Sequence, residues 1–132
     1  MERFEKDLVT FTRVLQKLQE LATRNVGTLS EMDRDAMIKR FEFCFELVWK
    51  TAKDYLWEIE GIEAASPKKV IRVCREQALL TTEEAMFALQ MTDDRNLTAH
   101  TYDEIFAQAM AARIKNYANL LEAWLSLLSR SY

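Results

Sequence analysis

Hydrophobic residues recur at steps of three and four along most of the chain. In the first segment they form a single stripe: Phe4, Leu8, Phe11, Leu15, Leu18 and Ala22. This spacing is typical of one face of an amphipathic helix. The second and longest segment has a wider apolar arc: Met37, Ile38, Phe41, Cys44, Phe45, Val48, Trp49, Ala52, Tyr55, Leu56 and Ile59. An arc this wide predicts a helix that contacts several neighbours or takes part in an oligomer interface.

Capping residues separate the predicted helices. Ser30 is a suitable N-cap for the second helix, and Gly61 is suited to end it. The pair Ser66–Pro67 predicts the start of a short third helix, since proline fits the first helical position. Two Thr-x-x-Glu capping boxes, at 81–84 and 101–104, predict the starts of a fourth and a fifth helix.

Composition supports a helical fold. The chain has 132 residues, of which 49% are hydrophobic, and it holds only two glycines and one proline. Strand-rich folds need many turns built from glycine and proline, so their scarcity favours long helices with short connections. We therefore expect an all-α fold in a single domain over residues 1–132: an up-down four-helix bundle with an additional short helix, about five helices in total.

Charge and hydropathy narrow the function classes. The formal net charge of −3 argues against broad binding to the nucleic-acid backbone. No apolar stretch is long enough to span a membrane, and the charged start of the chain does not resemble a secretory signal. We expect a cytoplasmic protein without membrane contact. Cys44 and Cys74 lie in apolar helical patterns and are expected to be buried free thiols. Three tryptophans at helical spacing are expected in the core, with base stacking as the alternative: Trp49, Trp57 and Trp124.

The candidate chemistry lies in residues 95–102, the signature segment, which contains the only histidine. A histidine can move a proton near neutral pH, and an arginine can hold phosphate charge with its planar donors. On one unbroken helix Arg95 and His100 would point about 140° apart. A helix that ends near Leu97, followed by a helix that begins at Tyr102, would instead bring both side chains to one end of the bundle.

Each of these residues also has an ordinary structural interpretation. His100 is next to a predicted cap, where histidines often cap a helix or face solvent. Arg95 could simply pair with Asp94 or with a distant glutamate, and Tyr102 is suited to pack against the preceding turn. Asp93 and Asp94 are adjacent, so they point to different sides of a helix, and no metal site is expected.

Three basic residues on the short third helix extend the candidate site. Lys68, Arg72 and Arg75 fall at positions i, i+4 and i+7, so they lie on one helical face. Such a face would suit a track of phosphate groups. The alternative is an ordinary solvated surface, since basic stripes of three residues are common.

The signature segment resembles a known family. Arg95 to His100 is similar to the Arg-polar-x-x-x-His motif of the HEPN superfamily, and Tyr102 gives it the Arg-x4-His-x-Tyr form of HEPN proteins paired with a minimal nucleotidyltransferase. The segments 41–50, 66–67 and 93–96 are similar to the nucleotidyltransferase substrate-binding protein branch. The resemblance covers essentially all of the chain.

This resemblance implies a helical homodimer with the signature segment at the dimer cleft. The chain would be a nucleotide- or substrate-binding subunit that partners a minimal nucleotidyltransferase, with a phosphate held by Arg95 and His100. The chain itself would need no cofactor, since nucleotide and magnesium are expected on the partner.

Two other functions stay open from the sequence. The first is a metal-independent endoribonuclease toxin, in which His100 is the general base, Arg95 stabilises the transition state and Asn96 orients a phosphate oxygen or the histidine. The resemblance implies that the partner would neutralise this toxin by adding adenylate to Tyr102. The second is a non-catalytic helical interaction protein. Whether the chain is an enzyme is therefore undecided at this stage.

Overall fold

The computed structural model describes residues 2–99 and 103–131. These residues form five α-helices and one 3-10 turn, without a strand in the described ranges: α1 (Glu2–Ala22), η1 (Val26–Thr28), α2 (Glu31–Glu58), α3 (Pro67–Glu76), α4 (Thr82–Thr98) and α5 (Glu104–Ser131). The all-α prediction, with one short helix among four long ones, is confirmed.

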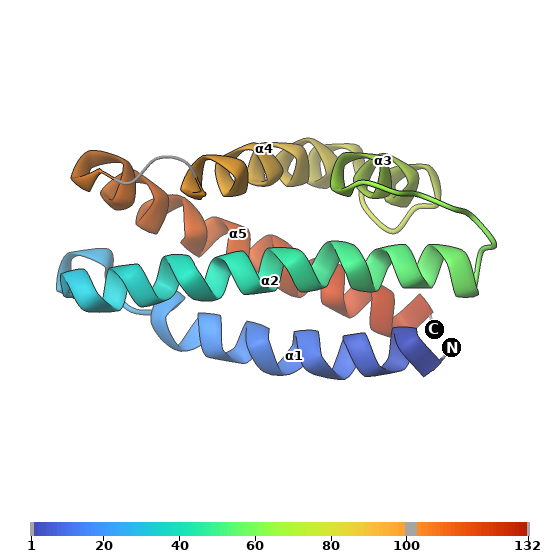
Figure 1. Cartoon of the computed structure of the whole chain (residues 1–132), viewed down its shortest axis with the longest axis horizontal. Helices are drawn as coiled ribbons and strands as arrows, with labels where there is room; N and C mark the ends of the chain where they lie inside the picture. The colour runs from blue at the N-terminus through green and yellow to red at the C-terminus, as the bar shows by residue number, and fades with distance from the viewer. Residues whose placement is uncertain (1, 100–102, 132) are drawn as a thin grey trace.

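The four long helices alternate in direction (Figure 1). Helix α2 packs against each of the other four, while α3 lies mainly on α4 at the end of the bundle that holds both chain termini. The α1–α2 connection lies at the opposite end, toward which α4 also runs. The bundle thus places the last turn of α4, with Arg95, away from the two termini.

Helix boundaries follow the predicted caps at most positions. The hydroxyls of Ser30, Ser66 and Thr81 each accept a hydrogen bond from the backbone N–H three residues on. The Glu84 carboxylate in turn accepts a hydrogen bond from the backbone N–H of Thr81 at 2.8 Å, which completes the capping box. Gly61 follows α2 with φ of +68°, a conformation that favours glycine because side chains rarely adopt it.

The predicted start of the last helix was wrong. The sequence pointed to a capping box of Thr101 and Glu104, but the described helix begins at Glu104 with Asp103 as its cap, whose Oδ1 accepts the Phe106 N–H at 2.8 Å. The Glu104 carboxylate instead accepts a hydrogen bond from Arg34 of α2, with Nη2 of Arg34 2.8 Å from Oε2 of Glu104. Aspartate caps a helix as well as threonine does, so the local pattern allowed both starts.

The predicted apolar stripes of α1 and α2 form the core. The largest fully buried side chains come from all five helices: Trp124, Tyr117, Phe4, Phe11, Phe41, Leu15, Leu18, Met37, Leu56, Ile71, Met91 and Met110. Trp124 is thus a core residue as expected, whereas Trp57 is 61% exposed, which corrects its core assignment. No helix in the described ranges is long and apolar enough to cross a membrane.

The two cysteines are buried free thiols, as the sequence predicted. Burial raises the pKa of both Cys44 and Cys74 to about 12, because a thiolate would lose its hydration in the core. Neither thiol is suited to act as a nucleophile.

Candidate functional site

The signature segment begins inside the last turn of α4. Arg95 and Asn96 lie on the helix, which ends at Thr98, one residue after the predicted end. The next helix begins at Glu104, so Arg95 and the residues after Thr98 do not lie on one continuous helix, as predicted. His100 and Tyr102 lie outside the described residues, and their approach to Arg95 stays a prediction.

Arg95 points toward α2. Its Nη2 lies 3.7 Å from Oε1 of Glu46, and its side chain is 23% exposed. Its Nε is buried and has no hydrogen-bond partner among the described residues. The guanidinium is therefore partly accessible, faces one distant carboxylate and still has an unused donor.

A second glutamate of α2 lies against the end of α4. The Thr98 hydroxyl lies 2.8 Å from Oε2 of Glu42 and 2.6 Å from the carbonyl oxygen of Arg95. Glu42 and Glu46 are one helical turn apart, so they present two carboxylates to the signature segment. The sequence allowed a distant glutamate as a partner of Arg95, but neither Glu42 nor Glu46 was identified from it. Their position within the apolar run 41–50 was the available clue, since charges there need a partner.

The two aspartates before Arg95 diverge, as their adjacency predicted. Asp93 faces α3, where its Oδ1 lies 2.7 Å from Nζ of Lys68. Asp94 is only 6% exposed and faces α5. Its carboxylate accepts hydrogen bonds from the Tyr117 hydroxyl at 2.5 Å and from Nη1 of Arg113 at 3.0 Å. Asp94 therefore fixes α4 to α5 one residue before Arg95, and it is not the partner of Arg95.

The environment of Tyr117 is consistent with this role. Burial, followed by the hydrogen bond to Asp94 and the charge of that carboxylate, raises the pKa of Tyr117. The phenol therefore stays protonated and remains a hydrogen-bond donor.

The basic residues of α3 are only partly joined to the signature segment. Lys68 contacts Asp93, whereas Arg72 and Arg75 are exposed farther along α3. The short connection of residues 77–81 holds Arg75 near the start of α4, while Arg95 lies in its last turn. A phosphate track along α3 would therefore lead away from Arg95.

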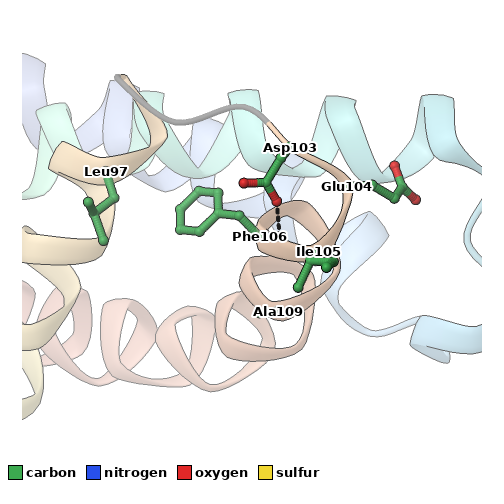
Figure 2. Close-up of a pocket in the computed structure, with 6 residues that line it drawn as sticks. All are labelled: Leu97, Asp103, Glu104, Ile105, Phe106 and Ala109. Atoms are coloured by element: carbon green, nitrogen blue, oxygen red, sulfur yellow. Dashed lines mark hydrogen bonds between the residues drawn. The ribbon is translucent and has the colours of Figure 1, made fainter.

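An open hollow of about 740 Å³ lies beside the α4–α5 junction. Its lining is mostly apolar: Leu97, Asp103, Glu104, Ile105, Phe106 and Ala109. Figure 2 shows the Phe106 ring pointing toward Leu97 across this hollow. Because Leu97 is two residues after Arg95, the two side chains leave α4 about 160° apart. The hollow and the Arg95–Glu46 contact thus lie on different sides of the helix.

Comparison with known protein families identifies the family of this helical bundle. A family model described as "Nucleotidyltransferase substrate binding protein like" matches residues 6–130. The chain belongs to this family. The match confirms the resemblance inferred from the signature segment and from residues 41–50. A comparison with curated protein sequences gave no significant match.

Solved structures contain the same fold as this substrate-binding-like protein. A crystal structure of a Thermus thermophilus protein is 49% identical, with a TM-score of 0.85, and the match covers 89% of this chain and 98% of that one. A mutant MntA–HpeT toxin–antitoxin structure is 13% identical, with a TM-score of 0.79, covering 98% and 99%. The tri-AMPylated Shewanella oneidensis HEPN toxin in complex with MNT antitoxin is 14% identical, with a TM-score of 0.77, covering 96% of each chain. At 13% and 14% identity, these last two similarities show a shared fold alone.

Proposed function

We propose that this chain is the nucleotide- or substrate-binding subunit of a two-component minimal nucleotidyltransferase. In this proposal Arg95 and His100 hold a phosphate group of the ligand at the cleft of a homodimer. The supporting observation is the state of Arg95, a partly exposed guanidinium whose buried Nε has no partner among the described residues. A phosphate oxyanion suits such a group, since it accepts two parallel hydrogen bonds from the planar fork.

The expected partner is a minimal nucleotidyltransferase. The family description supports this pairing, and so do the two distant structures, each of which joins a toxin with an MntA or MNT antitoxin. Nucleotide and Mg²⁺ for the transfer reaction would be held by that partner. The contribution of this chain would be to bind and orient the phosphate, for which Lys68, the basic residue of α3 that contacts the end of α4, offers additional positive charge. Arg72 and Arg75 lie farther along α3 and are not part of this proposed site.

The second candidate is a metal-independent endoribonuclease toxin. Asn96 is exposed beside Arg95 at the end of α4, which suits a role in orienting a phosphate oxygen. His100 would take the proton of a ribose 2′-hydroxyl, and Arg95 would stabilise charge on the phosphorane-like transition state. The leaving oxygen needs a second proton-transfer group, which a two-fold dimer would supply. The AMPylated state of the Shewanella toxin supports the idea of modification by the partner, and the resemblance of the signature segment points to Tyr102 as the modified residue.

Calorimetric titration of the purified chain with AMP tests the binding proposal. We expect Arg95→Ala and His100→Ala to weaken AMP binding, the first by about tenfold or more, because a charge-assisted bidentate contact is lost. Arg24→Ala is a matched control, since Arg24 is exposed and paired with Asp33 elsewhere. Equal AMP affinity for Arg95→Ala and Arg24→Ala would overturn the proposal.

Incubation with RNA in the presence of a metal chelator separates the two candidates. Cleavage that disappears in His100→Ala would establish the ribonuclease, and no cleavage by either protein would exclude it. Mass spectrometry after co-expression with the partner tests the modification: an adenylate on the chain that is lost in Tyr102→Phe supports the toxin. A chain that neither binds AMP nor cleaves RNA would be the non-catalytic interaction protein.

A further inference from the structure

Glu46 on α2 is shared between two cations. Its Oε1 lies 3.7 Å from Nη2 of Arg95, and its Oε2 lies 3.7 Å from Nζ of Lys50. Both separations are beyond ordinary hydrogen-bond distance, so each contact is a loose ion pair. The Glu46 side chain is 39% exposed, which leaves it room to change rotamer. The carboxylate is therefore held weakly between two competing partners.

The edge of the Arg95 guanidinium that faces the Glu46 carboxylate has donors that make no close hydrogen bond among the described residues. Nε and Nη2 form one edge of the guanidinium, the edge that binds two oxygens side by side. Nη2 faces the distant Glu46, and Nε is buried without an acceptor among the described residues. A buried donor without an acceptor is unfavourable. A phosphate that displaced Glu46 would satisfy both donors of this edge.

We propose that Glu46 is a built-in competitor for the phosphate site of Arg95, and that Lys50 takes over the Glu46 carboxylate when a phosphate monoester binds. This inference rests on the proposed function, because it takes Arg95 as the phosphate-binding group. Glu46 is then a positioning residue that lowers and tunes affinity. Without ligand it holds the guanidinium in place, and with ligand it must move away from a like charge.

The local geometry suits this exchange. Glu46 and Lys50 are at i and i+4, with the glutamate toward the N-terminus, which is the favourable order for a helical ion pair. Lys50 is more than half exposed and can follow the carboxylate. Glu42, one turn earlier, contacts the Thr98 hydroxyl at 2.8 Å and thus holds the end of α4 while Glu46 moves.

The experiment is a titration with inorganic phosphate and, separately, with AMP. Binding is monitored through the NMR signal of the Arg95 Nε–Hε group. Glu46→Gln should bind either anion about two- to fivefold more tightly, because a half-exposed like charge is removed beside it. Glu76→Gln is the matched control: it makes the same change in net charge at the exposed end of α3, and we expect it to bind like the wild type.

Lys50→Gln tests the second half of the exchange. We expect it to weaken anion binding by about twofold, because Glu46 then has Arg95 as its remaining partner. In a Glu46→Gln background the same Lys50→Gln change should have little effect on anion binding, because residue 46 then has no carboxylate with which Lys50 could pair. A double-mutant cycle measures this coupling directly.

The outcomes separate the two proposals. An Arg95 signal that moves equally in wild type, Glu46→Gln and Glu76→Gln would overturn the competition while leaving phosphate binding intact. An Arg95 signal that moves in none of these proteins would overturn the proposed function as well. A Lys50→Gln effect of equal size in both backgrounds would show only a general charge effect, and would overturn the role of Lys50.

Discussion

At the scale of single residues, the buried carboxylate of Asp94 is the main polar contact between α4 and α5. It accepts hydrogen bonds from Tyr117 and Arg113, and the next residue is Arg95. A carboxylate that is 6% exposed loses much hydration and depends on these donors. The orientation of Arg95 is therefore linked to a contact between α4 and α5 on another side of the helix.

Removing the Tyr117 hydroxyl should expose this dependence. We expect Tyr117→Phe to lower the free energy of unfolding by about 1–3 kcal/mol, because a buried acceptor loses a partner without loss of ring packing. Urea denaturation monitored by circular dichroism measures the effect. Asp93→Asn, next to Asp94 but exposed, is the control and should change stability by less than about 0.5 kcal/mol. Equal effects of the two changes would contradict the assignment.

A second residue-scale prediction concerns the pH dependence of stability. Burial, and then the hydrogen bond and charge of Asp7, raise the pKa of Asp54 from 3.8 to about 7. The folded state thus favours the protonated acid. Its contribution to stability is complete at pH values below the unfolded pKa and is lost as the pH rises through the folded pKa. The protonated carboxyl of Asp54 can donate a hydrogen bond to Asp7, which its ionised form cannot do.

Asp54→Asn should therefore flatten the pH profile of the melting temperature. Relative to wild type, the variant should gain stability as the pH rises from about 4 to about 7, because it has no carboxylate to ionise there. Calorimetric melting at several pH values provides the measurement. Profiles that run parallel over this range would show that Asp54 does not titrate there.

At the scale of elements, the helices were predictable because their causes are local. Stripes at steps of three and four, together with caps at Ser30, Ser66 and Thr81, determine where helices form and begin. The start of α5 was mispredicted because Thr101 and Asp103 are both good caps, and the choice depends on Arg34 of another helix, which occupies Glu104.

The carboxylates around Arg95 could not be predicted for a related reason. Glu42 and Glu46 meet α4 only through the packing of two helices that are about 50 residues apart in sequence. Periodicity places them on one face of α2, but it gives no register between α2 and α4. Chemistry that depends on residue type, such as Arg95, was visible from sequence, whereas the electrostatic surroundings were not.

The cap of α5 gives an element-scale prediction. Asp103→Ala should destabilise the chain by about 1 kcal/mol, since the Phe106 N–H loses its acceptor. Thr101→Ala is the matched control, because the sequence pattern assigned the cap to Thr101. We expect the control to change the chemical-denaturation midpoint less than Asp103→Ala does. A larger effect of Thr101→Ala than of Asp103→Ala would support Thr101 as the cap of α5, as the sequence suggested.

At the scale of the whole molecule, the apolar hollow beside the α4–α5 junction is a candidate pairing surface. Leu97 is 46% exposed and Ile105 is 81% exposed, and both line the hollow with Phe106. Exposed large apolar side chains that gather in one place often mark interaction sites. A homodimer formed here would bring together the C-terminal ends of the two α4 helices and the first turns of the two α5 helices.

Sedimentation measurements test this pairing. We expect wild-type chain to sediment as a dimer and Ile105→Glu to shift it to monomer, because a charge would be buried at the interface. Val9→Glu is the control, since Val9 is 60% exposed on α1 and lies away from the hollow. A wild-type chain with the mass of a single copy would contradict the homodimer.

Both chain termini lie together at one end of the bundle, and α4 runs from that end toward the other (Figure 1). Fusion tags, fluorophores or surface anchors attached to either terminus should therefore leave the last turn of α4 unobstructed. Chain immobilised through either terminus would keep Arg95 away from the surface, so capture assays for the proposed partner can use a tag at either end.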